Sequence, residues 1–593
     1  MLCANSAGKD KVEIELKLHQ YDTKAEKAAD VLDTMRLPLA VRQPNDLHAR
    51  TFLSGIDGSV QMYAVRPAAP GEAKADDKDT ANPGIVLTLH GAAVDAKEQA
   101  GQYSAKTWAH IVAPTNRRPY GFDWEDWGRI DALEALADAQ QRLGSDRRRV
   151  YVTGHSMGGH GAWHLGANYP DRFAAVGPSA GWVSFWTYGG MPKVDKPTKI
   201  QSLLTRATGP SDTLKLQKNL RQPGVYILHG DADDNVPVAQ ARLMRQDLGK
   251  FHPNFAYYEK PGGGHWWGAP SCDWPAMMEF FRQQQLPEAK DIKQIEFATT
   301  NPGVSSACHW VSIEAQQQQF EMSRVVISYA ADKRQFHATT QNVARLAVDV
   351  RHLDAGKGLQ FSFDGQRLPP VAWPASEPRV WFARHESRWI QTSKPAAAHK
   401  GPHRYGTFEE ALNHRVLMIY GTRGTADENA WSLAKARYDA ETFWYRGNAG
   451  VDVIPDTAFD AAKEPDRSVI LYGNADTNGA WPALLSTCPV QIRRGQVRLG
   501  TRPESGNDVA CLMVRPRPRS DVASVGVVSG TGLAGMRATN RLRYFVSGVA
   551  YPDLMVFGSG ALTQGDADIR VAGYFGLDWT MDEGDFEWRD LGL

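Results

Sequence analysis

Ser156 lies in a segment whose residue types and spacing suit a nucleophilic turn. The segment RVYVTGHSMGGHGAW (149–163) begins with alternating apolar and β-branched residues, continues with glycines around Ser156, and ends with apolar residues at helical spacing. A serine on a sharp turn from strand to helix can expose its hydroxyl for attack on a carbonyl carbon. The same pattern also suits a small residue in a glycine-rich turn, so the residues downstream decide between the two interpretations.

A catalytic serine of this kind needs a base within hydrogen-bonding reach and a carboxylate that orients the base. The segment VYILHGDADDNVPV runs from an apolar strand into a loop with three aspartates, Asp231, Asp233 and Asp234. The segment YYEKPGGGHWWG runs from a strand into a glycine loop that carries His265. The order serine, acid, histidine, each after a strand, is that of hydrolases with a nucleophilic turn. These residues predict Ser156 as the nucleophile and His265 as the general base.

The motifs GHSMGGHGAW, HGDADDNVPV and GGGHWW resemble the prolyl-oligopeptidase-type branch of the α/β-hydrolases and its bacterial esterase relatives. The resemblance covers residues 50–287. In the H-G-x-x-D-x-x-V pattern of that family the acid stands four residues after the histidine, which implies Asp233, with Asp231 and Asp234 as alternatives. It implies a serine hydrolase that requires no metal and no organic cofactor.

The same resemblance implies an oxyanion hole made of two backbone N–H groups. One comes from Met157, at the start of the helix after Ser156, where unpaired N–H groups favour negative charge. The other comes from the loop in IVLTLHGAAVD, with Ala92 as the expected donor and Ala93 as the alternative. The glycines on either side of Ser156 are expected because a side chain there would crowd the turn.

The elements that must position these residues form an α/β pattern. Strand-like and helix-like segments alternate over residues 50–287, which predicts a doubly wound, mostly parallel sheet with helices on both faces. Residues 1–49 form an N-terminal extension with a helix expected over 24–35. Residues 290–395 predict a small β-rich module, and residues 400–593 a second α/β region of flavodoxin-like or Rossmann-like type.

Composition gives no indication of a strongly charged partner or of a membrane span. The 593 residues carry a formal net charge of zero, which favours neither nucleic acid nor an anionic membrane surface. Apolar runs are too short for a membrane span of about 20 residues. The first residues lack the pattern of a signal peptide, and five dispersed cysteines leave disulfides and compartment open. The family resemblance alone favours export to the periplasm or the extracellular space.

Two further motifs are interpreted as structural. His160 and His164 have the spacing of metal ligands on a helix, but no third ligand accompanies them, so we expect core or surface histidines. The run VSGTGLAG matches a dinucleotide-binding pattern through three glycines, Gly530, Gly532 and Gly535. The acid that should follow, Asp553, stands at the start of its strand rather than at its end, so tight-turn glycines are the preferred interpretation.

Several tryptophans fall in loops near the predicted site: Trp124, Trp127, Trp182, Trp186, Trp266 and Trp267. Aromatic rings can stack on sugars and planar acyl groups, or they can pack the loops against the C-terminal region. The sequence supports both interpretations equally.

The expected function is hydrolysis of carboxylic esters, such as acetyl or feruloyl esters of polysaccharide, and the alternative is a peptidase acting on short peptides. Family peptidases carry a large β-propeller before the hydrolase domain, for which this chain has no room, and this departure favours esters. A third hypothesis is a binding protein with a vestigial site. Residues 290–593 are compatible with substrate docking, with homo-oligomer formation, or with shielding of the active site.

Overall fold

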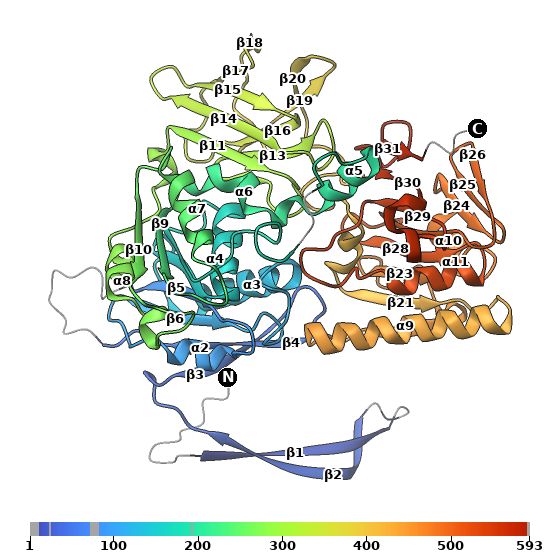
Figure 1. Ribbon diagram of the computed structural model, residues 1–593, viewed down its shortest axis with the longest axis horizontal. Coiled ribbons are helices and arrows are strands. Elements are labelled where there is room, and N and C mark those ends of the chain that lie inside the picture. The colour runs from blue at the N-terminus through green and yellow to red at the C-terminus, as the bar shows by residue number, and fades with distance from the viewer. Residues whose placement is uncertain (1–10, 23–24, 26, 71–81, 191–193, 590–593) are drawn as a thin grey trace.

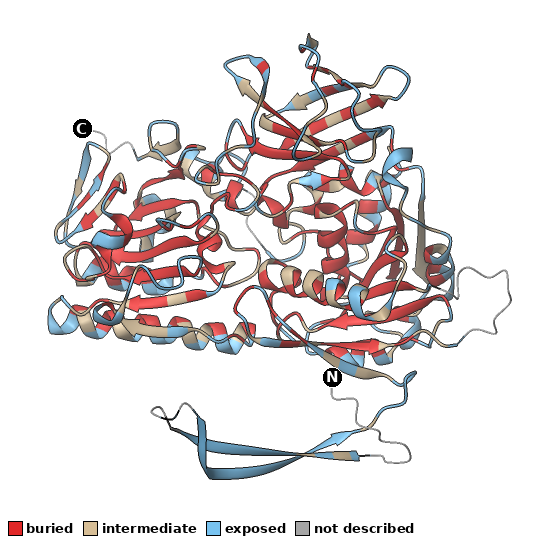
Figure 2. Ribbon diagram, turned by 180° about the vertical axis from the view of Figure 1, so that it is seen from behind, coloured by how far each residue is buried: buried red, intermediate tan, exposed pale blue. Residues whose placement is uncertain are grey.

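The computed structural model describes residues 11–22, 25, 27–70, 82–190 and 194–589. Three bodies lie side by side, and an N-terminal hairpin projects from them (Figure 1). Buried residues concentrate in the sheets of the three bodies, whereas the hairpin is exposed along its length (Figure 2). None of the helices in this described part of the chain has both the length and the apolar character needed to cross a membrane.

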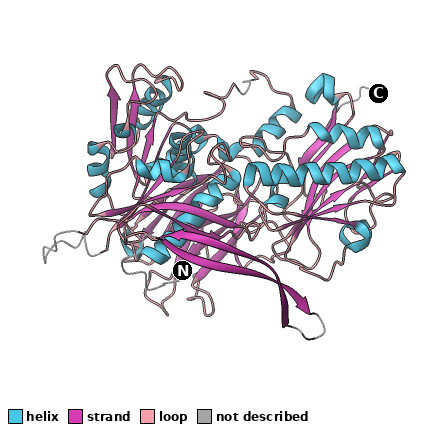
Figure 3. Ribbon diagram, turned by 90° about the horizontal axis from the view of Figure 1, so that it is seen from below, coloured by secondary structure: helices cyan, strands magenta, loops and turns pink. Residues whose placement is uncertain are grey.

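The N-terminal extension forms an antiparallel hairpin of β1 (Lys11–Asp22) and β2 (Lys27–Ala40). The helix expected over 24–35 is therefore wrong for the residues described there. The period of two in β1 places Val12, Ile14 and Leu16 opposite Leu39, Leu37 and Met35, on one face of the ribbon. Pairing along this apolar row favours strand over helix. Figure 1 shows the hairpin apart from the three bodies, and in Figure 3, seen from below, its two long strands cross the view in front of them.

The first body contains an eight-stranded sheet in the order β10-β9-β8-β7-β5-β6-β4-β3. Strands β5 to β10 run parallel, and the β3–β4 and β4–β6 pairs are antiparallel. This order confirms the expected α/β-hydrolase arrangement. The strands are β3 (His48–Leu53), β4 (Val60–Arg66), β5 (Gly84–Leu89), β6 (Ala109–Pro114), β7 (Val150–His155), β8 (Ala175–Ser179), β9 (Gly224–Gly230) and β10 (Phe255–Lys260).

Helices cover both faces of this sheet, and the central strands are buried along their whole length. On β5, Ile85 and Leu87 pack with helix α3, whereas Val86 packs with α8 on the opposite face. The helices in this part of the chain are α2 (Ala96–Gly101), α3 (Asp126–Leu143), α4 (Met157–Asn168), α5 (Lys199–Ala207), α6 (Thr213–Leu216), α7 (Ala239–Leu248) and α8 (Pro275–Arg282); of these, α5 packs against the third body rather than against this sheet.

The second body is a β-sandwich, in agreement with the β-rich texture of its sequence. Its sheets have the orders β11-β14-β15-β17-β18 and β12-β13-β16-β19-β20, and apolar side chains from both fill one core. The strands are β11 (Gln294–Thr299), β12 (Ala307–Cys308), β13 (Val311–Gln316), β14 (Ser323–Ala330), β15 (Gln335–Gln341), β16 (Val343–Asp349), β17 (Gln360–Phe363), β18 (Gln366–Arg367), β19 (Arg379–His385) and β20 (Arg388–Thr392).

The third body has a sheet in the order β22-β21-β23-β28-β27-β29-β30-β31, which is parallel only from β22 to β28. A flavodoxin-like sheet would be parallel throughout, so that expectation holds for half of the sheet. The link between β27 and β28, residues 517–523, is too short for a crossover and enforces an antiparallel pair. The strands are β21 (Val416–Tyr420), β22 (Asp452–Pro455), β23 (Ser468–Tyr472), β27 (Ala510–Pro516), β28 (Ser524–Gly530), β29 (Leu554–Phe557), β30 (Ile569–Tyr574) and β31 (Asp585–Trp588).

Helices and a small sheet complete this body. The helices are α9 (Ala426–Gly447), α10 (Trp481–Leu485), α11 (Leu533–Ala538) and α12 (Ala561–Gln564), and the small sheet consists of β24 (Val490–Arg493), β25 (Gln496–Leu499) and β26 (Arg502–Ser505). Cys272, Cys308, Cys488 and Cys511 are buried free thiols, and Cys3 lies outside the described residues.

A buried ion pair ties the end of the sandwich region to the third body. Lys400 Nζ lies 2.5 Å from Asp553 Oδ2, and both side chains are fully buried. Asp553 also accepts hydrogen bonds from the backbone N–H groups of Thr407, at 2.8 Å, and Phe575, at 3.0 Å. The carboxylate therefore organises three segments and does not face a ligand.

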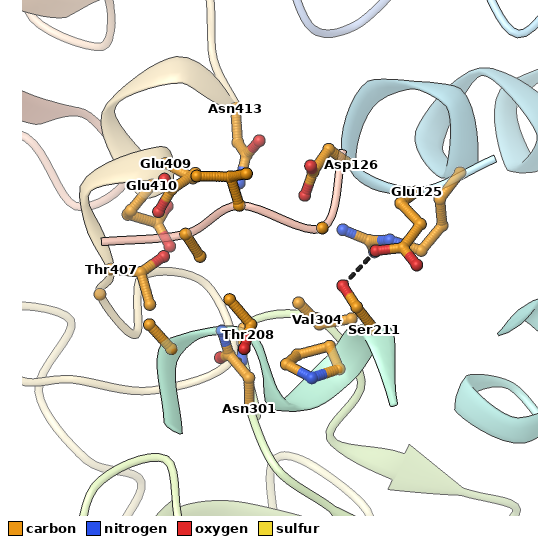
Figure 4. A pocket seen from close by; sticks show the side chains of 18 of the residues that line it. Glu125, Asp126, Thr208, Ser211, Asn301, Val304, Thr407, Glu409, Glu410 and Asn413 are labelled. Carbon is orange, nitrogen blue, oxygen red and sulfur yellow. Dashed lines mark hydrogen bonds between the residues drawn. The ribbon is translucent and has the colours of Figure 1, made fainter. Parts of the chain in front are cut away.

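A small polar cavity lies where the three bodies meet. Its volume is about 40 Å³, which suits a few water molecules but not a small organic ligand. Figure 4 shows Glu125 and Asp126 on one side of it and Glu409 and Glu410 on the other. Glu125 accepts hydrogen bonds from Ser211 and from His160 Nε2, the latter at 3.0 Å.

The carboxyl groups around this cavity do not share one protonation state. Burial, reinforced by the charge of Glu125, raises the pKa of Asp126 to about 7. Burial also raises the pKa of Glu409 well above its usual range. Burial disfavours the ionised form of Glu125 as well, but the nearby His164 and His160 favour that form more strongly, so the pKa of Glu125 is lowered. Below a pH of about 7, an ionised Glu125 therefore faces Asp126 and Glu409 in their protonated forms.

Replacing Lys400 by methionine should destabilise the protein strongly. The substitution leaves the Asp553 carboxylate buried without its cation, which costs about 3–5 kcal/mol. We expect a clear fall in Tm by differential scanning calorimetry. The double variant Lys400→Met with Asp553→Asn should recover part of the loss, because no charge then remains buried. A Tm equal to that of the wild-type protein for Lys400→Met would contradict this account.

Asp126→Asn should stabilise the protein more at pH 8 than at pH 5. The folded state keeps the Asp126 proton up to a pKa of about 7, whereas the unfolded chain releases it near 3.8, so stability falls as pH rises between these values. Asparagine cannot ionise, so we expect the variant to gain roughly 4 °C in Tm over wild type at pH 8 and less at pH 5. Asp332→Asn, in an exposed turn, is the control and should show no such difference.

Candidate active site

Ser156 occupies a strained turn between β7 and α4. Its φ is 60° and its ψ is −120°, a conformation that serine rarely adopts. The turn is tight because a Cβ at Gly158 would lie 1.9 Å from the carbonyl oxygen of Leu89, and one at Gly154 would lie 2.4 Å from that of Gly158. The Ser156 N–H donates to the carbonyl of Ser179 at 2.9 Å. The neighbouring strands thus hold the serine side chain at the carboxyl edge of the sheet.

The structure brings Ser156, His265 and Asp233 together in one hydrogen-bonded chain. His265 Nε2 lies 2.8 Å from Ser156 Oγ, and His265 Nδ1 lies 2.9 and 3.0 Å from the two carboxylate oxygens of Asp233. The alternative acids lie elsewhere: Asp231 accepts from the Gly262 N–H at 2.7 Å, and Asp234 is exposed. This is the arrangement in which a histidine can take a proton from a serine hydroxyl.

Asp233 is held as a carboxylate by its surroundings. Its buried side chain accepts from the N–H groups of Asn235 and Val236, each at 2.9 Å, and lies 3.2 Å from His229 Nε2. Burial alone would raise the pKa of Asp233, but the hydrogen bonds from His229, His265 and Asn235 outweigh burial and hold it well below its usual range. Asp233 can therefore stabilise a positive charge on His265.

Two histidines support this chain in ways that the sequence did not indicate. His155 Nε2 lies 2.7 Å from the backbone carbonyl of His265, so it fixes the loop that carries the base. Burial, and then the charge of His265, lower the pKa of His155 to about 4, which keeps it neutral at pH 7. His229, near the end of β9, contacts Asp233 directly. In the sequence, only position points to these two histidines: His155 stands one residue before Ser156, and His229 stands four residues before Asp233.

The predicted oxyanion donors lie beside Ser156. Met157 is the first residue of α4, where N–H groups lack partners within the helix. The turn after β5 is also close, because a Cβ on Gly91 would lie 3.5 Å from Ser156 Cβ. In that turn the Ala93 N–H donates to the Pro119 carbonyl at 3.2 Å, which favours Ala92 over Ala93. The oxyanion assignment remains a prediction.

The tryptophans divide between the core and the surface. Trp124 is fully buried and donates to the His90 carbonyl at 3.0 Å; Trp127 is 2% exposed and donates to the Leu412 carbonyl at 3.1 Å. Neither ring can face a substrate, so the interpretation of these two as substrate contacts is corrected: they pack the loop after β6.

The remaining tryptophans differ in exposure. Trp182 is largely buried and stacks on His160, with ring centroids 4.7 Å apart, and Trp267 is partly buried. Trp186 is partly exposed, and Trp266 is 48% exposed with its ring 5.1 Å from that of His155. Trp266 is therefore the tryptophan best placed to reach a substrate beside His265.

The two motifs interpreted as structural occupy packed positions. His160 and His164 are buried around Glu125, and no group of residues in the described parts of the chain could hold a metal ion. At Gly530 a Cβ would meet the Met536 nitrogen at 2.3 Å, and at Gly535 it would meet the Val509 carbonyl oxygen at 2.2 Å. These glycines permit close packing of α11 on β27 and β28.

The region around this site matches a known protein family. Residues 118–285 match the model of the prolyl oligopeptidase family. A curated relative, described as an uncharacterized secreted protein of Arthroderma benhamiae, is 25% identical over 607 residues, which cover 97% of this chain and 63% of the relative. The chain thus spans less than two thirds of the length of that relative.

Two solved structures illustrate the range of similar proteins. A ferulic acid esterase from Anaeromyces mucronatus is 15% identical, with coverage of 41% of this chain and 93% of that one and a TM-score of 0.28. A puromycin-hydrolyzing peptidase of Mycobacterium tuberculosis is 17% identical, with coverage of 47% and 52% and a TM-score of 0.33. Both scores lie below 0.5, so neither likeness says what this chain acts on. Residues 118–285, which contain Ser156, Asp233 and His265, match the prolyl oligopeptidase family, and the N-terminal half of this chain has the α/β-hydrolase fold.

Proposed function

We propose that this protein hydrolyses carboxylic esters through an acyl-enzyme on Ser156 and that its substrates are acylated polysaccharides. The observation that carries the proposal is the hydrogen-bonded chain from Ser156 Oγ through His265 to Asp233. A serine within reach of a base, with that base oriented by a carboxylate, is the arrangement required for covalent catalysis.

The mechanism follows from these contacts. Ser156 Oγ attacks the ester carbonyl carbon while its proton passes to His265 Nε2, and Asp233 stabilises the resulting imidazolium. The carbonyl oxygen becomes an oxyanion that accepts hydrogen bonds from the N–H groups of Met157 and Ala92. The intermediate then expels the alcohol, which takes the proton from His265. Water attacks the acyl-enzyme in the same way, with His265 again as base, and releases the acid.

Two features support esters over peptides. The bodies after residue 287 are a sandwich and a mixed sheet, and none of the described residues forms the blades of a propeller such as family peptidases carry. Trp266 is exposed beside the predicted base, where its ring can stack on a sugar or a planar acyl group. A peptidase acting on short peptides is the second candidate, since residues 118–285 match a family named for peptide hydrolysis.

The proposal also includes the cellular location in which the protein acts. The relative from A. benhamiae is described as secreted, which supports an exported location for this chain. Polysaccharide esters are substrates that an exported enzyme would meet.

A matched pair of substrates tests the proposal. For an ester and an anilide that share one acyl group, we expect kcat/KM to be much higher for the ester, because an anilide is the poorer acceptor of attack. Ser156→Ala should abolish turnover of both. Comparable turnover of the anilide would replace the esterase assignment by the peptidase one, and full activity of Ser156→Ala would remove the proposal altogether.

Substitution of the neighbouring aspartates tests the proposed acid. Asp233→Asn should lower kcat about 10⁴-fold, because asparagine cannot stabilise the imidazolium or fix its tautomer. Asp234→Asn is the matched control, one residue along the same loop and exposed, and it should retain nearly full activity. Equal losses in the two variants, measured as kcat on a small ester, would show that the loop as a whole is responsible.

A further inference from the structure

A cleft separate from the Ser156 site lies in the third body, between helix α9 and the segment 540–546. Its volume is about 440 Å³, within the range of small-molecule sites. We define it as the arginine cleft by six of its polar lining residues, Tyr438, Thr442, Arg446, Asn540, Arg541 and Arg543; Asp439 and Tyr544 line it as well. Three of these lining residues are arginines and one is an aspartate, so positive charges outnumber negative ones.

Carboxylates within the protein do not neutralise these arginines. Among the residues that the structure describes, no ion pair joins Arg446, Arg541 or Arg543 to an acidic side chain. Asp439 also lines the cleft, but its carboxylate is bound to Lys435 Nζ at 2.6 Å and to the hydroxyl groups of Tyr472 and Tyr544. Planar guanidinium groups that are free to form paired hydrogen bonds favour a carboxylate or a phosphate as ligand.

One further carboxylate lies near the cleft. Burial raises the pKa of Asp123, and the charge of nearby Arg446 opposes that rise. A carboxylate oxygen of Asp123 also accepts a hydrogen bond from the Ser547 hydroxyl. Burial is the larger effect and raises the pKa of Asp123, which weakens it as a competitor for Arg446.

Phe545, which lines the cleft, is packed in a buried cluster of aromatic rings. The Phe545 ring stacks on Phe443 with centroids 4.0 Å apart and an interplanar angle of 3°, and its edge meets Trp127 at 4.8 Å. These three rings are buried at the junction of the third body with the first body. A preformed cleft binds a ligand without the entropic cost of ordering its walls.

Exposed aromatic rings accompany the arginines. Tyr438 in the cleft wall is 62% exposed; Trp444 and Tyr445 are also exposed on α9 but lie outside the cleft lining, and the Arg118 guanidinium lies over the Trp444 ring. Rings of this kind stack on sugars, whereas a bare phosphate offers nothing to stack. The volume of the cleft likewise exceeds what a single phosphate needs. The combination of cations, exposed rings and amide and hydroxyl groups matches a sugar that bears a carboxylate.

The cleft adjoins loops that surround the predicted active site. Phe545 meets the edge of Phe122 at 4.9 Å, and a Cβ on Gly548 would lie 2.6 Å from the Phe185 ring. Phe185 in turn neighbours the ring of Trp182, which stacks on Tyr188, whose hydroxyl donates to Asn235 in the Asp233 loop at 3.0 Å. The segment that forms one wall of the cleft is thus packed on loops next to the one that carries Asp233.

We propose that the arginine cleft binds uronate residues of an acidic polysaccharide, the chain that carries the ester cleaved at Ser156. This inference rests on the proposed function for the identity of the polymer. The carboxylate of one uronate residue pairs with Arg541 and Arg543, Arg446 contributes to the same positive field, and the sugar ring packs on Tyr438. Residues 400–593 would then serve in substrate docking.

Calorimetric titration tests this proposal without any need for catalysis. Full-length protein carrying Ser156→Ala is titrated with a de-esterified oligogalacturonate, with a neutral xylo-oligosaccharide of equal length and with inorganic phosphate. We expect binding of the oligogalacturonate that weakens as salt rises. Arg541→Gln with Arg543→Gln should reduce its affinity at least 10-fold, and Tyr438→Ala should reduce it severalfold while Tyr438→Phe retains it. Arg537→Gln, exposed on α11 outside the cleft, is the matched control and should bind as the parent does.

Each other result overturns the proposal. Equal binding of the neutral oligosaccharide would remove the role of the carboxylate, and equal arginine-dependent binding of phosphate would show a site for small anions. Unchanged affinity in the double variant, with a Tm equal to that of the parent, would place the ligand elsewhere, and absence of binding would leave the cleft without a uronate. Hydrolysis of a small neutral ester by the wild-type protein, measured separately, reports on the proposed function alone.

Discussion

The tight contact between the turn at Ser156 and the end of β5 sets the geometry on which the rest of this structure depends. Glycines at 154 and 158 allow the strand-to-helix turn to press against the Leu89 carbonyl, and the serine accepts a left-handed φ as a result. The strain is sustained because β5, β7 and β8 are central, parallel and buried on both faces. Every other part of the site, from the His265 loop to the oxyanion turn, is positioned relative to this fixed point.

Hydrogen bonds fix the orientation of the side chains in the site. His265 is oriented from one side by Asp233 and held through its own carbonyl by His155. Asp233 is itself oriented by backbone N–H groups and by His229, so its charge is stabilised before any substrate arrives. Such an environment costs no reorganisation when positive charge develops on the base.

The third body is packed against the first body through apolar rings and through buried polar groups. Trp127, Phe443 and Phe545 form the apolar contact, and close by lies the polar cavity lined by Glu125, Asp126 and Glu409. Apolar contact supplies most of the stabilisation, whereas the buried polar groups restrict which orientation of the bodies satisfies their hydrogen bonds. The loops that follow β6 and β8 are thereby held from behind by residues distant in the sequence.

The sequence by itself determined the features that depend on local pattern. It located the turn at Ser156, the loop of His265, the parallel sheet that positions them and the β-rich texture of the second body, because glycine spacing and hydrophobic period act over a few residues. Tertiary structure decided the features that depend on distant partners. It selected Asp233 among three aspartates through loop geometry, placed Trp124 and Trp127 in the core through packing, and made residues 27–40 a strand through pairing with β1. It also reversed strands in the third sheet, because a short loop leaves no room for a crossover.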